Sequence, residues 1–303
     1  MKSIITILIM LSTASVASAQ TSSRNAAEVG MTSNANLTKE NPTSDAYVRI
    51  SSSNSLVRGD DTLGLRLGYV DYARENINDM FSLRISDRRT SSNWSFTGAL
   101  FTNVYTYGSS PGTTDNAFTN VGAEFRGERS QSWRSNALEY GGGYRLRVFP
   151  SFDGRNDHTA FALATLDREM SSQLSLGAIS EFGILLSSLS EYSRIYLDLG
   201  GTLDYQLPDS WTLTGDLTLS QSFFLNRTVT TQTAVSRSRG SGATGSRTSG
   251  ETYSSLSLSA EGMRQQTETF RWGFGAFVTN QASASGSLDY SVLDVLAKLN
   301  LNF

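Results

Sequence analysis

Apolar and polar residues alternate along the last seventeen residues of the chain, from Ser287 to Phe303. The apolar face carries Phe303, Leu301, Leu299, Ala297, Val295 and Leu293, and the polar face carries Asn302, Asn300, Lys298 and Asp294. A period of two residues predicts a β-strand, and this one exceeds the five or six residues that are about average in soluble sheets. Its length matches a strand that crosses a bilayer at a tilt. The bilayer core offers no hydrogen-bond partners for the backbone N–H and C=O groups of an open strand edge, so the pattern predicts a closed barrel.

The same alternation recurs through most of the chain from Thr62 onward. In the clearest example, Trp211 to Phe223, leucines such as Leu213, Leu217 and Leu219 occupy one face, and the other face is Thr, Asp and Ser. We count about twelve such strands, and ten to fourteen fit the pattern. The sequence therefore predicts an all-β fold, a transmembrane antiparallel up-and-down β-barrel over residues 62–303.

Long and short interruptions alternate between the predicted strands. The longest are 107–116 and 226–250, and a typical short one is Leu207–Ser210. Short turns of outer-membrane barrels face the periplasm and long loops face the exterior, so the chain should end on the periplasmic side. Residues 20–61 carry little hydrophobic period and are expected to form a flexible periplasmic segment, with 46–50 either a short strand or a piece in the barrel mouth.

The first nineteen residues have the layout of a secretory signal peptide. Lys2 supplies the positive start, residues 4–11 are almost entirely apolar, and Ala17-Ser18-Ala19 forms a small-residue cleavage site. The apolar run is too short for a spanning helix. Residues 1–19 are therefore expected to direct export, and the barrel is expected in the outer membrane of a Gram-negative bacterium.

Composition narrows the chemistry that the chain can perform. There is no Cys and only one His, so thiolate sites, disulfides and His-rich metal sites are excluded, and no metal or cofactor is expected. The formal charge of −3 gives no argument for nucleic acid.

Strand parity collects charged residues on the face turned away from lipid. Because charges are costly in hydrocarbon, these residues should line a polar lumen. The pore-lining candidates are Arg66, Arg84, Glu124, Arg126, Glu139, Arg145, Arg147, Glu181, Arg194, Asp198, Asp216, Glu261, Arg271 and Lys298. Glu261 and Arg271 are expected to form a pair across the turn at 264–268.

Three functions are compatible with such a barrel. A passive channel for small hydrophilic solutes is favoured, because arginines and carboxylates in a wet lumen create a transverse field that selects solutes. A structural or surface-interaction barrel, with its lumen closed by salt bridges, is the alternative. An outer-membrane hydrolase is disfavoured, because the single His158 stands isolated at a strand rim and a nucleophile without a base is weak. The Arg-containing stretch 227–250 is expected to be an external loop. A solvated loop is preferred to one that contacts the phosphates of lipopolysaccharide or folds over the pore mouth.

The segment Leu296–Phe303 resembles the C-terminal assembly signal of Gram-negative outer-membrane proteins. Phe303, Leu301 and Leu299 stand at its aromatic and hydrophobic positions, whereas Lys298 and Leu296 depart from it. This resemblance implies recognition by the barrel-assembly machinery and contact with outer-membrane lipid and lipopolysaccharide. The predicted barrel also resembles twelve-stranded outer-membrane channels, but this likeness concerns architecture and specifies no solute.

Overall fold

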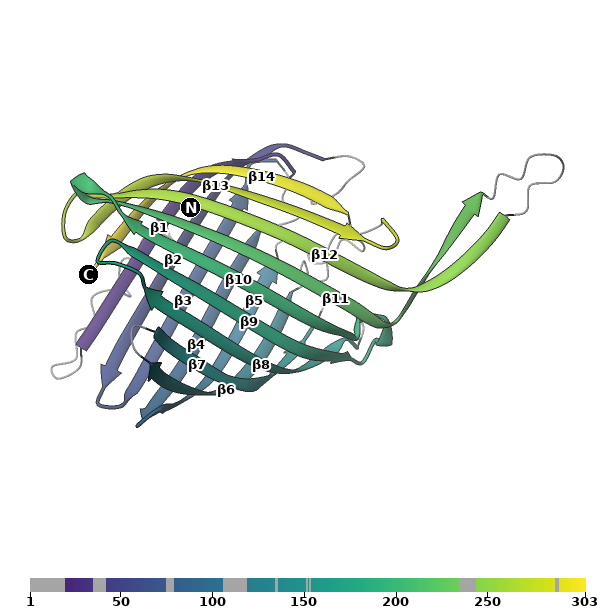
Figure 1. The fold of residues 1–303 in the computed structure, drawn as a ribbon, viewed down its shortest axis with the longest axis horizontal. Helices are drawn as coiled ribbons and strands as arrows, with labels where there is room; N and C mark the ends of the chain where they lie inside the picture. Colours follow the sequence, from purple (N-terminus) through teal and green to yellow (C-terminus); the bar gives the residue numbers. More distant parts are fainter. Residues whose placement is uncertain are drawn as a thin grey trace.

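A computed structural model describes residues 20–34, 42–74, 79–105, 119–133, 136–150, 152, 154–234, 244–286 and 289–303 of the chain. In this part of the chain, fourteen antiparallel strands form one closed barrel in which each strand pairs with its neighbours in sequence (Figure 1). The first strand pairs with the last, so the sheet has no free edge. The all-β, antiparallel up-and-down barrel inferred from the alternation is thus confirmed.

The strands are long throughout. Their bounds are β1 Gln20–Thr32, β2 Asp45–Arg58, β3 Asp61–Tyr72, β4 Met80–Ser91, β5 Trp94–Tyr105, β6 Asn120–Trp133, β7 Asn136–Val148, β8 Asn156–Glu169, β9 Leu174–Ser187, β10 Arg194–Gln206, β11 Trp211–Ala234, β12 Thr244–Gln265, β13 Phe270–Ser283 and β14 Tyr290–Asn302. Two single-turn 3-10 helices, Ser190–Tyr192 and Pro208–Ser210, lie between strands. None of the described helices is long and apolar enough to cross a membrane.

The count of about twelve strands is wrong, because the segment 20–61 contains two more strands and is not a flexible tail. β1 and β2 pair with each other over their full length, and β1 also pairs with β14. Their outward positions include polar residues such as Ser23, Asn25 and Asn54, so the sequence period is weak there. Backbone pairing does not depend on that period, and closing the barrel satisfies the edges of both β1 and β14. The expected signal peptide, residues 1–19, lies outside the described residues.

The two ends of the barrel differ, as the interruptions predicted. At one end, here called the short-turn end, tight connections such as Ser92–Asn93 join the strands, and both Gln20 and Phe303 lie there. The opposite, long-loop end carries the longer connections. The stretch 226–250 is not one loop: β11 and β12 continue their pairing to Ala234 and Thr244 after a register shift between Phe223 and Thr228. This hairpin extends well beyond the neighbouring strands in Figure 1.

The outer face of the barrel is apolar and carries an aromatic band at the short-turn end. All four tryptophans of the chain, Trp94, Trp133, Trp211 and Trp272, lie within three residues of a strand terminus at that end. Trp211 and Trp272 contact each other edge to face, with ring centroids 5.5 Å apart. Tryptophan favours the boundary between hydrocarbon and water, so this band marks one membrane interface.

Candidate channel lumen

All fourteen candidate pore-lining residues occupy strand positions on the inner face. The cross-strand register places the candidates on one common face of the sheet. The opposite face of the same strands carries the exposed apolar residues. For example, Glu181 lies between outward-facing Ser180 and Phe182 and is the register partner of Asp198. Strand parity in the sequence was sufficient to find these positions because a strand alternates strictly between its two faces.

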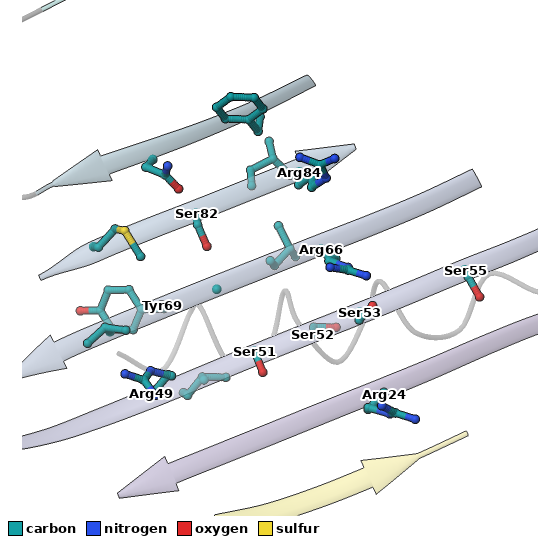
Figure 2. A pocket seen from close by; sticks show the side chains of 18 of the residues that line it. Arg24, Arg49, Ser51, Ser52, Ser53, Ser55, Arg66, Tyr69, Ser82 and Arg84 are labelled. Carbon is teal, nitrogen blue, oxygen red and sulfur yellow. The ribbon is translucent and has the colours of Figure 1, made fainter. Parts of the chain in front are cut away.

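One line of register partners across the inner face is rich in arginine. Starting at β1, it runs Arg24, Ser53, Arg66, Arg84, Phe101, Gly122 and Arg147, one residue on each of β1 to β7. We call this line the arginine row. Figure 2 shows its first members, Arg24, Ser53, Arg66 and Arg84, crossing four neighbouring strands.

On β2 to β5, the inner-face residues on either side of the arginine row are mostly small. Toward the long-loop end they are Ser51, Gly68, Ser82 and Asn103, and toward the short-turn end they are Ser55, Gly64, Ser86 and Ala99. Short side chains leave space beside the arginines. A cavity of about 860 Å³ lies against this wall, lined by six arginines, several serine residues and Glu124 (Figure 2).

Glu124 neutralises part of this positive wall. Its Oε1 accepts a hydrogen bond from Arg84 at 2.7 Å, and its Oε2 accepts one from Arg145 at 2.6 Å. The carboxylate is almost fully buried, with 6% of its side chain exposed. Within the described part of the chain, Arg24, Arg66 and Arg147 have no carboxylate within 4 Å. The wall therefore keeps a net positive charge.

Phe101 connects the two halves of the arginine row. The guanidinium carbons of Arg84 and Arg147 each lie 6.0 Å from the centre of its ring. The ring rests on Gly122, where an added Cβ would stand 2.2 Å from the Phe101 Cζ. A side chain at Gly122 would displace the ring, so this glycine is required for the close approach. Phe101, Arg24 and Arg49 could not be recognised from the sequence, since aromatic and N-terminal positions carry no distinguishing signal.

A second line of register partners is acidic and lies mainly on β8 to β14, the strands that the arginine row does not cross. It runs Asp167, Gly177, Thr202, Asp216, Ser259, Phe277, Asp294, Thr32 and Asp45, from β8 through β14 to β1 and β2. We call it the acidic row. Asp216 accepts a hydrogen bond from Ser259 at 2.7 Å, and nearby Asp204 accepts one from Thr214 at 2.8 Å. These donors are neutral hydroxyl groups, and no cation is paired with either carboxylate in the described part of the chain.

The pair expected between Glu261 and Arg271 is wrong. Glu261 is the register partner of Gly275, and Arg271 pairs with Gln265, four residues away along each strand. Glu261 instead accepts hydrogen bonds from Lys298 Nζ, which lies 3.1 Å from both carboxylate oxygens. Lys298 Nζ also lies 3.3 Å from Glu28 Oε1, and Arg49 binds Glu28 Oε2 at 2.9 Å. The sequence missed this network because Glu28 lay in the supposed tail.

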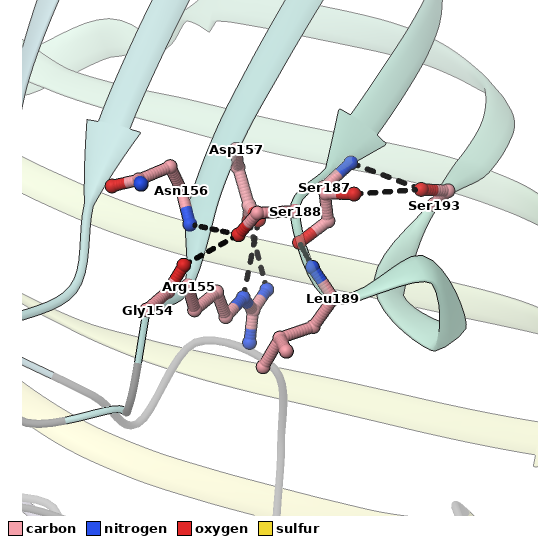
Figure 3. Close-up of polar contacts among 8 residues, drawn as sticks. All are labelled: Gly154, Arg155, Asn156, Asp157, Ser187, Ser188, Leu189 and Ser193. Atoms are coloured by element: carbon pink, nitrogen blue, oxygen red, sulfur yellow. Dashed lines mark hydrogen bonds and ion pairs between the residues drawn. The ribbon is translucent and has the colours of Figure 1, made fainter.

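At the long-loop end, the arginine row ends beside a buried ion pair between Arg155 and Asp157. Asp157 is the register partner of Arg147, but its two oxygens accept hydrogen bonds from Arg155, at 3.2 and 2.8 Å (Figure 3). Arg155 is buried and stacks on the rings of Phe149 and Tyr192, at 4.3 and 3.8 Å from their centres.

Serine side chains hold the neighbouring backbone of this cluster in place. The Ser188 hydroxyl accepts from the Asn156 N–H and donates to the Gly154 carbonyl (Figure 3). The connection between β7 and β8 is thereby attached to the connection between β9 and β10.

His158 lies on the outer face of β8, as the register partner of Leu146 and Leu186. The Tyr144 hydroxyl is hydrogen bonded to its Nδ1. It is directed away from the lumenal carboxylates, so it does not form a catalytic group with them. Among the described residues, no cluster of three or more His, Cys, Asp or Glu could hold a metal ion.

Comparisons with known proteins concern the fold. No protein-family model matches the chain, and no curated protein matches it. A bacterial polysaccharide outer membrane secretin matches with a TM-score of 0.51 and 10% identity, over 93% of this chain and 98% of that one.

Two further solved structures match over a similar share of the chain. The anion-selective porin from Comamonas acidovorans has a TM-score of 0.49 and 6% identity, over 94% and 99% of the two chains. In-vitro folded OmpT, an outer membrane protein of Vibrio cholerae, has a TM-score of 0.49 and 7% identity, over 94% and 97%. Together with the closed antiparallel topology, the secretin match shows that the chain has the fold of an outer-membrane β-barrel.

Proposed function

We propose that this barrel is a passive channel for small hydrophilic solutes in the outer membrane of a Gram-negative bacterium. The observation that carries the proposal is the cavity of about 860 Å³ against the arginine row, which small side chains leave unfilled. Ile179 supports it from the other side of the lumen. This residue lies on the inner face, as the partner of Thr165 and Gly200, yet 48% of it is exposed. An apolar side chain packed in a filled barrel would be covered.

The charges favour polar solutes over apolar ones. The arginine row and the acidic row lie on different parts of the wall and so produce a field across the lumen. Such a field orients dipolar solutes and slows apolar ones, because an apolar solute must displace water from charged groups. Arginine keeps its charge at every relevant pH, so the positive wall is permanent.

A structural barrel with a closed lumen is the second candidate. The ion pairs of Glu124 with Arg84 and Arg145, and of Lys298 with Glu28 and Glu261, are the observations that favour it. Salt bridges of this kind hold two or three strands together at mid-barrel. They predict a rigid wall but do not require a conducting lumen.

Planar-bilayer recording separates the two candidates. We expect the refolded mature chain to insert in discrete conductance steps. Ile179→Trp should lower the size of each step, because it adds volume on the inner face. Phe182→Trp is the matched control, since Phe182 lies on the same strand and faces outward. Correctly folded protein that gives no steps would contradict the channel and support the closed barrel.

Location and assembly are part of the same proposal. We expect the protein in outer-membrane fractions, with a gel mobility that changes on heating as for other barrels. Contact with lipid and lipopolysaccharide follows from the apolar outer face, and delivery by the barrel-assembly machinery follows from the terminal aromatic. Recovery as a soluble periplasmic protein would contradict the proposal.

A further inference from the structure

We propose that the arginine row is a binding track for small anions that carry two or more phosphate or carboxylate groups, and that it climbs the inner wall of the barrel toward the long-loop end. This inference deepens the proposed channel function and rests on it. It names the class of solute and the wall along which the solute moves.

The row ascends the barrel wall. Arg24 is the fifth residue of β1 counted from the short-turn end, Arg66 the sixth of β3, Arg84 the eighth of β4, and Arg147 the twelfth of β7. Adjacent strands are about 4.8 Å apart and tilted by about 40°, so each step along the row climbs roughly 3 Å. The six steps from Arg24 to Arg147 therefore climb about 18 Å, most of the thickness of an outer-membrane barrel's apolar band.

The strongest site on this track is the pair Arg66 and Arg84. The two residues are direct register partners, so their Cβ atoms are about 5 Å apart. Like charges placed directly opposite each other repel, and only Arg84 has a carboxylate partner in the described part of the chain. A phosphate or carboxylate group between the two guanidinium groups would relieve this repulsion. Guanidinium groups bind such anions through paired hydrogen bonds.

The surroundings suit an anion with several polar oxygens. Ser53 lies between Arg24 and Arg66 in the row, and the Ser51, Ser55 and Ser82 hydroxyls line the same cavity. Hydroxyl groups can donate to anion oxygens that the arginines leave free. Phe101 then carries the positive wall onward, since it contacts both Arg84 and Arg147.

The spacing of the charges favours more than one anionic group in the solute. Arg24 is two strands from Arg66, about 10 Å away, and Arg147 is three strands from Arg84, about 14 Å away. A solute with one charge would have to leave one arginine before it reached the next. A solute with several charges can hold one site while it engages another, and therefore gains from the series.

Tripolyphosphate is a suitable probe, and calorimetry is a suitable measurement because it does not depend on conductance. We would titrate the refolded full-length mature chain in a neutral detergent at fixed ionic strength. Inorganic phosphate, which has a single phosphate group, serves as the comparison. We expect tripolyphosphate to bind more tightly than phosphate. Arg66→Gln should weaken tripolyphosphate binding about tenfold, which corresponds to about 1.4 kcal/mol.

The matched control is Arg271→Gln. Arg271 is an inner-face arginine near the short-turn end, on β13 and outside the row. Arg271→Gln should change the affinity for tripolyphosphate less than twofold, whereas Arg66→Lys should retain part of the parent protein's affinity. If Arg66→Gln lost the heat-dependent gel mobility of a folded barrel, Arg24→Gln would take its place.

Four outcomes are informative. Equal losses in Arg66→Gln and Arg271→Gln would overturn the track and indicate only a diffuse positive potential. Equal affinity for phosphate and tripolyphosphate would overturn the inference that the solute carries two or more anionic groups. Conductance steps without tripolyphosphate binding would overturn the track but leave the channel standing. Tripolyphosphate binding that depends on Arg66 without any conductance would support the anion site and overturn the channel.

Discussion

Arg66 and Arg84 are register partners on β3 and β4, with both guanidinium groups on the inner face of the barrel. Their environments differ in one respect that matters for stability. Arg84 donates to the buried carboxylate of Glu124 at 2.7 Å, whereas Arg66 has no carboxylate within 4 Å among the described residues. One arginine of the pair is thus part of the structural network, and the other is available to a solute.

This difference predicts opposite effects of the same substitution on stability. Arg66→Gln should leave the free energy of unfolding unchanged or raise it by up to about 1 kcal/mol, because it removes a repulsion between opposite residues. Arg84→Gln should lower it by about 1 to 3 kcal/mol, because it removes a charged hydrogen bond from a buried carboxylate. Urea unfolding of the two variants in lipid vesicles measures both values. A larger loss in Arg66→Gln than in Arg84→Gln would contradict this assignment.

Glu124→Gln should make the lumen more positive. The substitution removes Glu124, the one carboxylate among the described residues that line the cavity, and releases Arg84 and Arg145 toward the solute. Reversal potentials in a potassium chloride gradient should therefore move toward anion preference. Glu139→Gln is the control, because Glu139 accepts from the Ser130 hydroxyl and holds no arginine in the described structure. An equal shift in both variants would show that the location of the charge is unimportant.

The double variant Arg145→Ala and Arg147→Ala should have the reverse effect. It removes two lumenal positive charges and two long side chains from the cavity wall. We expect the reversal potential to move toward cation preference and the conductance of each step to rise. Unchanged currents would place both side chains away from the path of the ions, and the lumenal charges would then be better explained as salt bridges that maintain the barrel shape.

Arg155→Met should destabilise the long-loop end. Arg155 and Asp157 are both buried, and the substitution leaves the Asp157 carboxylate without its guanidinium partner. Breaking a buried ion pair on one side costs about 3 to 5 kcal/mol. Pulsed proteolysis should cut between β7 and β8 sooner than in the parent protein. The double variant Arg155→Met with Asp157→Leu should recover much of the loss, because no buried charge then remains unpaired.

Deletion of Phe303 tests the C-terminal resemblance. The Phe303 N–H donates to the Ser23 carbonyl and the Ser23 N–H donates to the Phe303 carbonyl, both at 2.8 Å. The deletion removes the terminal aromatic together with the last contact that joins β14 to β1. We expect less protein in the outer membrane of cells that express the variant. Normal insertion would show that the terminal pattern does not act as an assembly signal in this chain.

The sequence determined the fold class and the inner positions of the charged residues, for one physical reason. A strand places successive side chains on opposite faces, and lipid accepts only apolar ones, so alternation over ten or more residues reports both the strand and its orientation. This is why the sequence alone places Glu124, Arg145 and Asp216 on the polar face of their strands. The period is hidden at Gln20–Thr32 and Asp45–Arg58, where polar residues occupy outer positions, so the sequence did not predict these two strands.

Only the tertiary structure decided which charges meet. Register depends on backbone pairing between neighbouring strands and on closure of β1 against β14, and neither is visible in the period of a single strand. A shift of two residues between neighbouring strands keeps every side chain on its face but gives it a different partner. The observed register brings Glu261 and Glu28 to Lys298 and leaves Arg271 outside this network. The same register aligns Arg24, Arg66, Arg84 and Arg147 into one row, and no segment of the sequence by itself contains that row.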